Sequence, residues 1–227
     1  MAYYNLVKHC YFCKVDSQYL FLVLHKDLYL SLEKNESAEF EKRFIQRSPG
    51  NQQPDDFLQS LVEKGILYVS DTWRHTATPL LGQTPRKDLI GFRINVQPEI
   101  NVVHVLRFFN ASLCTWIRFK LLPLKWQILW FEVKKKLFAK HAKRKEQLQD
   151  LVEINNLLRP FLFTAKNRCL YESMVLMDFL SYYGFYPNLV IGVKMGPFSA
   201  HCWLQDQETV LNDSVTHTSW HTPILII

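Results

Sequence analysis

The sequence predicts an α+β protein made of a small N-terminal unit and a larger C-terminal domain. Two observations predict this organisation: strand patterns precede helical patterns in the first third of the chain, and helix alternates with strand in the last third. The 227 residues are 48% hydrophobic and include only seven glycines, which suits one large or two small packed cores. We place the first unit at residues 1–75, a linker at 76–100 and the second domain at 101–227.

Three runs rich in Tyr, Phe, Val and Leu predict strands at Leu6–Lys14, Tyr19–Leu24 and Leu28–Leu32. Polar residues at 16–18 and 25–27 predict the turns between them. Strands separated by such short turns pair as an antiparallel meander.

Two helical patterns and one more strand complete the first unit. The first pattern covers Ser37–Gln46, with Asn35 or Ser37 as the predicted cap. The second covers Asp55–Lys64, and Ile66–Val69 then returns to a strand pattern.

This order of elements is typical of a winged-helix-like fold. It also resembles the precursor-recognition domains of peptide-modifying enzymes, the family that includes the small PQQ-biosynthesis chaperone. In that family the leader peptide adds as a strand to the third strand and lies against the last helix. The resemblance implies a leader-binding site made of Asp27, Leu28, Tyr29, Leu30, Leu32, Phe57, Leu58 and Leu61.

A structural or DNA-binding winged helix is the alternative for this unit. The predicted helix Asp55–Lys64 begins with two aspartates and carries one lysine, which makes a poor surface for phosphates. We therefore expect no nucleic-acid partner.

The middle of the chain predicts a linker followed by helices. Prolines and glycines between residues 70 and 98 indicate a linker with a short strand at Leu89–Val96. Helical patterns then run from Val102 to Leu158.

A basic stretch lies within this helical region, because Lys134–Lys145 holds seven Lys or Arg residues. Apolar residues between Trp126 and Leu137 recur at helical spacing just before it. A solvated helix face above a buried stripe is the simplest interpretation. The alternatives are an anionic partner, a nucleotide phosphate, or an acidic membrane surface that residues 126–145 would contact from one side.

The cysteines and the N-terminus favour a cytoplasmic protein, which could still be membrane-associated as part of a biosynthetic complex. Five cysteines are present, an odd number, and residues 1–8 lack the basic and apolar segments of a signal peptide. No apolar stretch reaches the length of a membrane span.

Cys169 opens a strong helical pattern that runs to Tyr183, with Asn167 as the predicted cap. A thiolate in the first turn of a helix lies near free backbone N–H groups and the positive end of the helix dipole. Both lower the pKa of a thiol, so Cys169 is a candidate nucleophile.

A predicted hairpin supplies the residues that would activate the cysteine. Strand patterns cover Asn188–Lys194, Pro197–Leu204 and Thr209–Asp213. If Gln205 pairs with Thr209 across a three-residue turn, His201 lies opposite Asp213, and the two can hydrogen-bond on one sheet face.

These segments resemble the lasso-peptide B proteins, which are leader peptidases with a transglutaminase-like, papain-related fold. In some members the peptidase follows a precursor-recognition domain, as it would here. The resemblance implies that Cys169 is the nucleophile, His201 the general base and Asp213 the orienting acid. One departure is Cys202, where the family usually has a small residue. The resemblance is carried by Arg168–Leu170, Leu189–Val193, Pro197–Trp203 and Val210–Asp213.

The resemblance also implies the substrate and the partner. The protein would remove the leader of a ribosomally made lasso-peptide precursor before an asparagine-synthetase-like cyclase closes the macrolactam. The sequence has no Gly-x-x-x-x-Gly-Lys loop, so we expect no intrinsic cofactor, and any ATP dependence would act through the cyclase. A non-catalytic precursor-binding adaptor and a transglutaminase-type acyltransferase are the alternatives.

Zinc is the rival chemistry at two places. Cys10 and Cys13 form a Cys-x-x-Cys pair, but no second pair of ligands follows at a suitable spacing. The other candidate set is His201, Cys202, His217 and His221. Strand alternation points Cys202 to the face opposite His201, so we expect Cys202 in the core and no metal site.

Overall fold

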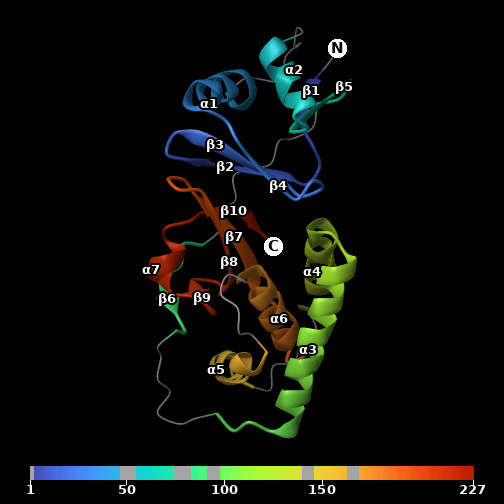
Figure 1. Ribbon diagram of the computed structural model, residues 1–227, viewed down its shortest axis with the longest axis vertical. Helices are drawn as coiled ribbons and strands as arrows, with labels where there is room; N and C mark the ends of the chain where they lie inside the picture. The colour runs from blue at the N-terminus through green and yellow to red at the C-terminus, as the bar shows by residue number, and fades with distance from the viewer. Residues whose placement is uncertain (1–2, 47–54, 74–82, 91–97, 140–145, 163–168) are drawn as a thin grey trace. The chain divides into compact units, whose positions relative to one another are not determined.

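The computed structural model describes residues 3–46, 55–73, 83–90, 98–139, 146–162 and 169–227 (Figure 1). The chain divides into two compact units, Met1–Leu81 and Gly82–Ile227. Both contain helices and strands, which confirms the predicted α+β class.

The N-terminal unit contains the predicted meander. Strands β2 (Cys10–Val15), β3 (Gln18–Val23) and β4 (Leu28–Ser31) form an antiparallel sheet in the order β2-β3-β4. The two residues between β2 and β3, Asp16 and Ser17, both have positive φ angles, 48° and 69°. Two such residues make the tight turn whose twist matches that of the flanking strands.

The prediction of one continuous strand over Leu6–Lys14 is wrong, because this segment contains the end of one strand and most of another. β1 (Tyr3–Leu6) leaves the meander and pairs antiparallel with β5 (Leu67–Ser70). The chain turns between β1 and β2 at His9, whose φ is 63°. No glycine or proline marks this turn, so the sequence pattern continues through it.

The two predicted helices form, with different starts. α1 (Lys34–Phe40) continues into a short π-helix, η1 (Glu41–Ile45). Its cap is Glu33, whose backbone N–H donates to the Glu36 carboxylate at 3.0 Å, so the prediction of Asn35 or Ser37 is wrong. Ser37 is instead buried, where its hydroxyl accepts the N–H of Tyr19 at 3.0 Å.

α2 (Asp56–Glu63) lies within one residue of its predicted bounds. Asp55 caps it by accepting the N–H groups of Phe57 and Leu58 at 3.0 and 3.2 Å. Gly65, with a φ of 76°, ends it.

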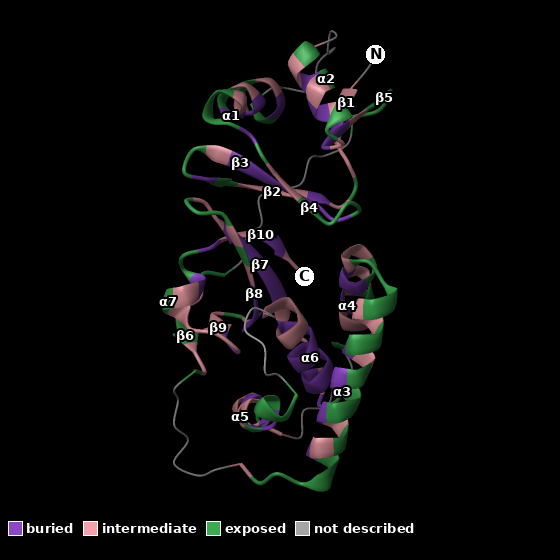
Figure 2. Cartoon of the chain, viewed as in Figure 1, coloured by how far each residue is buried: buried purple, intermediate pink, exposed green. Residues whose placement is uncertain are grey.

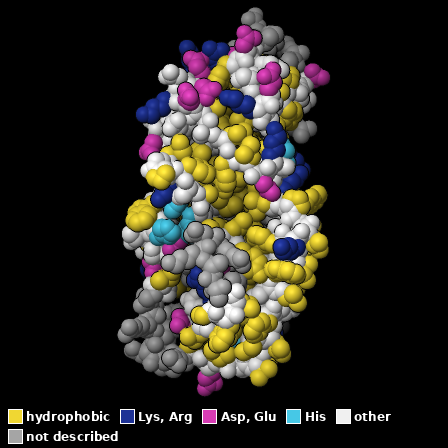
Figure 3. All heavy atoms as spheres, viewed as in Figure 1, with side chains coloured by type: hydrophobic (Ala, Val, Ile, Leu, Met, Phe, Trp, Pro, Cys, Tyr) yellow, Lys and Arg dark blue, Asp and Glu magenta, His cyan; other side chains and the backbone are white. Residues whose placement is uncertain are grey.

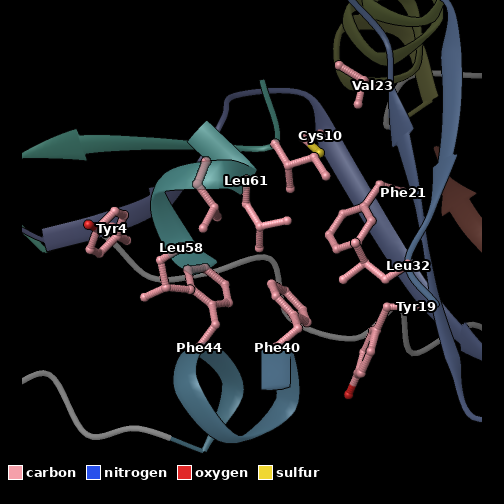
Figure 4. Close-up of a cluster of buried hydrophobic side chains, with 12 residues drawn as sticks. Tyr4, Cys10, Tyr19, Phe21, Val23, Leu32, Phe40, Phe44, Leu58 and Leu61 are labelled. Atoms are coloured by element: carbon pink, nitrogen blue, oxygen red, sulfur yellow. The ribbon is translucent and has the colours of Figure 1, made fainter. Parts of the chain in front are cut away.

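The first unit has its own hydrophobic core (Figure 4). Rings from the sheet and the helices meet there, with Phe21 and Phe40 at 5.2 Å between centroids. The buried members are Tyr4, Cys10, Tyr19, Phe21, Val23, Leu32, Phe40, Phe44, Leu58, Leu61, Ile66 and Leu67.

The C-terminal unit is built on a five-stranded sheet in the order β10-β7-β8-β9-β6. Its strands are β6 (Lys87–Asp88), β7 (Asn188–Lys194), β8 (Ser199–Asp206), β9 (Thr209–Val210) and β10 (Thr222–Ile226). β6 runs parallel to β9, and the other neighbours are antiparallel. The expected linker thus contributes a strand, β6, which ends directly before the predicted strand Leu89–Val96. Residues 91–96 of that predicted strand lie outside the described chain.

Helices pack beside this sheet. The predicted helical region forms α3 (Val102–Leu121), α4 (Leu124–Phe138) and α5 (Leu148–Leu158), with a single 3₁₀ turn, η3 (Arg159–Phe161), after α5. α6 (Cys169–Ser181) contacts β8 as well as α3 and α5, and Figure 2 shows that most of it is buried. α7 (Val215–Thr218) is a single turn. None of the described helices is both long and apolar enough to cross a membrane.

A buried carboxylate ties three of these helices together. Asp178 on α6 is 2% exposed and accepts the Thr115 hydroxyl of α3 at 2.9 Å. It also forms ion pairs with Arg118 of α3 and with Lys134 of α4, the latter at 2.9 Å. The prediction of a solvated basic face is therefore wrong for Lys134, and residues 140–145 of that stretch lie outside the described chain.

Candidate active site

Cys169 is the first residue of α6 and is partly buried. The structure describes α6 from Cys169 onward, and the predicted cap, Asn167, lies outside the described residues. A side chain at the start of an α-helix lies at the positive end of its dipole. The fold therefore favours a negative charge on this sulfur.

The hairpin of β8 and β9 is shifted by one residue from the predicted register. Gln205 pairs with Val210 and Asp206 with Thr209, so the turn holds two residues and not three. A regular continuation of this register would put Asp213 opposite Cys202, on the face away from His201. The predicted pairing of Gln205 with Thr209 is thus wrong.

The strand does not continue regularly, because the side chain of Asn212 replaces a backbone partner. Leu211 still donates its N–H to the carbonyl of Leu204 at 2.9 Å. The N–H of Leu204, however, donates to Oδ1 of Asn212 at 2.8 Å. The chain bends here, and the Asp213 carboxylate accepts a short hydrogen bond from Nε2 of His201.

Asn212 also links the hairpin to α6. Its Nδ2 donates to the hydroxyl of Ser173 at 2.9 Å, and that hydroxyl lies 3.3 Å from the carbonyl of Cys202. Ser173 is fully buried one turn after Cys169. Strand and helix patterns in the sequence do not predict this connection. The signal that could have indicated it is a hydroxyl one turn after the nucleophile.

A second histidine shares the Asp213 carboxylate. His217 on α7 approaches the same oxygen, Oδ2, through Nδ1 at 2.8 Å. Ser214 begins α7 by accepting the N–H of His217 at 3.1 Å. The ring centroids of His201 and His217 are 4.5 Å apart, and Figure 3 shows histidine side chains gathered in this part of the surface. Sequence reasoning assigned His217 only to a possible zinc set.

His221 and Trp203 complete the surroundings of His201. The His201 ring lies 5.3 Å from that of His221 and 6.1 Å from that of Trp203, nearly parallel to the latter. Gly192 of β7 makes room for both neighbours. A Cβ at Gly192 would lie 2.7 Å from the Trp203 ring and 2.9 Å from Cβ of His221.

The electrostatics favour a charged pair of thiolate and imidazolium. Burial raises the pKa of Cys169, but the hydrogen bond and charge of His201, with the N–H groups of Cys202 and Leu170, lower it below its ordinary value. Burial lowers the pKa of His201, but its hydrogen bonds to Asp213 and Cys169 raise it to about 9. Since the Nε2 of His201 binds Asp213, its Nδ1 is left for the sulfur.

Asp213 stays ionised at neutral pH. Burial raises its pKa, but hydrogen bonds from His201, His217 and the N–H of Ser214 outweigh this effect and lower it to about 2. Burial lowers the pKa of His221, whose Nδ1 lies 3.2 Å from the carbonyl of His217. Neutral His221 therefore donates to that carbonyl and accepts the Ser199 hydroxyl at Nε2.

The possible metal ligands do not form the predicted set. In the described part of the chain, one group of donors lies close enough for a metal ion: His201, Asp213 and His217. Two of the four candidates, Cys202 and His221, are not in this group, and Cys202 is buried, as expected for a core residue. Hydrogen bonds already join the three members through Asp213.

Cys10 and Cys13 fit a structural role better than a metal site. Both are free thiols on β2, and burial raises the pKa of each to about 12. Because they lie three residues apart on one strand, their side chains point to opposite faces of the sheet, which does not suit a shared metal ion.

The residues predicted to hold a leader peptide fall into two groups. β4 is an end strand of its sheet in the described chain, with Leu28 exposed and Tyr29, Leu30 and Phe57 partly exposed. Asp27 lies in the turn before β4, with a φ of 49°. Leu32, Leu58 and Leu61 are at most 1% exposed and belong to the core, so they are not surface contacts.

Comparison with known families assigns the second unit. The model of the transglutaminase-like superfamily matches residues 112–225, a stretch that begins within α3, ends within β10 and includes Cys169, His201 and Asp213. No curated protein and no solved structure gave a significant match. Since the family model covers half of the chain, the protein belongs to the transglutaminase-like superfamily.

Proposed function

We propose that the protein is a cysteine peptidase that removes the leader segment of a lasso-peptide precursor. The observation that carries the proposal is the arrangement of Cys169, at the start of α6, with the hydrogen-bonded pair of His201 and Asp213. Membership of the transglutaminase-like superfamily supports thiol chemistry in general. The resemblance of the Cys169, His201 and Asp213 segments to lasso-peptide B proteins supports the specific substrate.

In the proposed reaction, Cys169 attacks the carbonyl carbon at the end of the leader. The sulfur forms a bond to that carbon while the proton of the thiol resides on His201. His201 then gives this proton to the leaving amine, and the peptide bond breaks to leave an acyl-enzyme. Water, deprotonated by His201, releases the leader and restores the thiol.

Asp213 and the backbone would support these steps. Asp213 holds the Nε2–H of His201, which keeps Nδ1 directed at the sulfur and stabilises the imidazolium. Backbone N–H groups at the start of α6 are available to the oxyanion of the tetrahedral intermediate.

The N-terminal unit would hold the leader. An extended peptide beside β4 would gain main-chain hydrogen bonds, with Leu28, Leu30 and Phe57 providing apolar contacts. The buried residues Leu32, Leu58 and Leu61 would support this surface from below.

The decisive experiment compares the wild type with Cys169→Ala, each incubated with the precursor and the partner cyclase. We expect the wild type to release the leader and the variant to leave it attached, a loss of at least about 10³-fold in rate. Cys114→Ala, which changes a partly buried cysteine of α3, is the matched control and should cleave normally. Processing by Cys169→Ala would instead favour a non-catalytic adaptor.

The family also includes acyl transfer as an outcome, because an acyl-enzyme can react with an amine in place of water. Mass spectrometry of the products separates the two reactions. Hydrolysis yields a leader with a free carboxylate, whereas transfer yields a leader joined to an amine.

A further inference from the structure

The solvent-facing side of α3 carries an apolar stripe from Val102 to Trp116. Large apolar side chains occur there at intervals of three or four residues, so they share one face of the helix. Each is 44–72% exposed. In a typical surface helix this face would be polar, because the opposite face is the one that packs on the protein. These residues are Val102, Leu106, Phe109, Leu113 and Trp116.

α4 repeats the pattern. Trp126, Trp130, Val133 and Leu137 follow the same spacing and are 50–60% exposed. The two faces adjoin, because the guanidinium of Arg118 on α3 lies 6.0 Å from the Trp130 ring and 5.3 Å from the Phe131 ring. Figure 3 shows apolar side chains covering the region where α3 and α4 lie in Figure 1. We call these nine residues of α3 and α4 the apolar face.

The surroundings of the apolar face are strongly basic. Residues 102–139 contain seven Lys or Arg and one acidic residue, Glu132, a formal charge equal to the +6 of the whole chain. Arg118 and Lys134 share the one negative charge of buried Asp178. Among the residues that the structure describes, Lys120, Lys125 and Lys136 are in no ion pair, and Lys125 lies 5.7 Å from the Trp126 ring.

We propose that the apolar face and its lysines bind the surface of an anionic lipid bilayer. Tryptophan beside lysine is suited to the boundary between headgroups and acyl chains, where the ring is half-buried and the cation meets phosphate. A second copy of the chain is a poorer occupant, because pairing two such faces would bring like charges together. The proposed membrane-binding surface is larger than the stretch 126–145 that the sequence indicated, because it includes α3.

The test is sedimentation of the full chain with two kinds of vesicle, phosphatidylcholine alone and phosphatidylcholine mixed with phosphatidylglycerol. We expect binding to the anionic vesicles, at least about tenfold weaker binding to the neutral ones, and release at high salt. The triple variant Lys120→Gln, Lys125→Gln, Lys136→Gln should bind about a hundredfold more weakly, since each surface cation contributes a few-fold.

Two further variants test the apolar contribution. A quadruple variant that places glutamine in the apolar face should no longer bind vesicles, while its circular dichroism should show an unchanged helix content. Its substitutions are Leu106→Gln, Leu113→Gln, Trp126→Gln and Leu137→Gln. The control is Leu157→Gln with Phe161→Gln, which removes exposed apolar groups of α5 and η3, outside the apolar face, and should bind normally.

Three outcomes would overturn the proposal. The first is that the wild type binds neutral and anionic vesicles equally well, or binds neither. The second is that the α5 and η3 control loses as much vesicle binding as the apolar variant. The third is that the wild type is a dimer and the apolar variant a monomer. The last would show that the face joins two copies. Since no readout involves cleavage, the proposal stands or falls separately from the peptidase.

Discussion

Two aspartates in the C-terminal unit, Asp178 and Asp213, each hold two positively charged or protonatable partners, yet they suit different tasks. Asp178 is almost fully buried and faces Arg118 and Lys134, whose charges are permanent at physiological pH. Asp213 is more exposed and faces His201 and His217, whose ordinary pKa lies near neutrality. A carboxylate with fixed cations holds helices together, whereas one with imidazoles can take part in proton transfer.

Of the substitutions at the two aspartates, removing the charge of Asp213 should have the largest effect on catalysis. In Asp213→Asn the side chain keeps its shape but no longer stabilises the imidazolium of His201, so kcat/KM for leader removal should fall by about 10²-fold or more. Asp150→Asn on α5 is the matched control and should change it little. An Asp213→Asn enzyme with wild-type kcat/KM would contradict the proposed role of this residue.

Removing the other carboxylate should affect stability instead. Asp178→Ala leaves the partly buried Arg118 and Lys134 without their partner, and we expect a loss of about 3–5 kcal/mol in the free energy of unfolding. Arg86→Ala breaks the exposed pair with Glu208 and should cost about 0–1 kcal/mol. Urea unfolding measures both, and equal losses would refute the difference between buried and exposed pairs.

The packing around His201 should be nearly as sensitive. Gly192→Ala forces Trp203 or His221 to move, which we expect to cost about 1–3 kcal/mol. In a Trp203→Leu background the same substitution should cost less, because the nearest clash is gone. A double-mutant cycle without coupling would show that the glycine is needed for another reason.

The pair of His201 and Asp213 should make stability depend on pH. The pKa of His201 is raised to about 9, so its stabilising contribution is fully present below about pH 6.5 and is lost as pH rises through about 9. The pKa of Asp213 is lowered to about 2, so its contribution is present above about pH 4 and is lost as pH falls through about 2. Unfolding free energies between pH 6.5 and 9 should therefore fall in the wild type and stay flatter in Asp213→Asn.

The smallest effect is expected at His217. His217→Asn removes one of the two imidazoles at Asp213 but leaves the bond to His201, so kcat/KM should fall less than about tenfold. A loss as large as that of Asp213→Asn would mean that His217 is itself required for the chemistry.

Local patterns in the sequence predicted most of the elements, because alternation and helical spacing reflect which faces are buried. The meander and α2 are examples. The break after β1 was missed because His9 adopts a positive φ without a glycine, and the cap of α1 because Glu33 is an unusual capping residue. Asp178 was missed because its partners lie 44 and 60 residues away.

The candidate site illustrates a prediction that was right for an incomplete reason. The proximity of His201 and Asp213 was expected from a regular ladder in the wrong register, and the bend at Asn212 corrects the one-residue error. A side chain that replaces a backbone partner has no signature in strand periodicity, so local patterns do not reveal it.

That bend has a consequence for how such sites diverge. The side chain of Asn212 is hydrogen-bonded to the backbone of Leu204 in β8. The position of Asp213 therefore depends on this contact and not on the number of residues in the hairpin turn. The tip at Gln207 and Glu208 can therefore gain or lose residues during evolution without displacing the carboxylate. A search for distant relatives should therefore require an asparagine directly before the aspartate, as in Asn212 and Asp213. It should allow the number of residues between the histidine and this asparagine to vary.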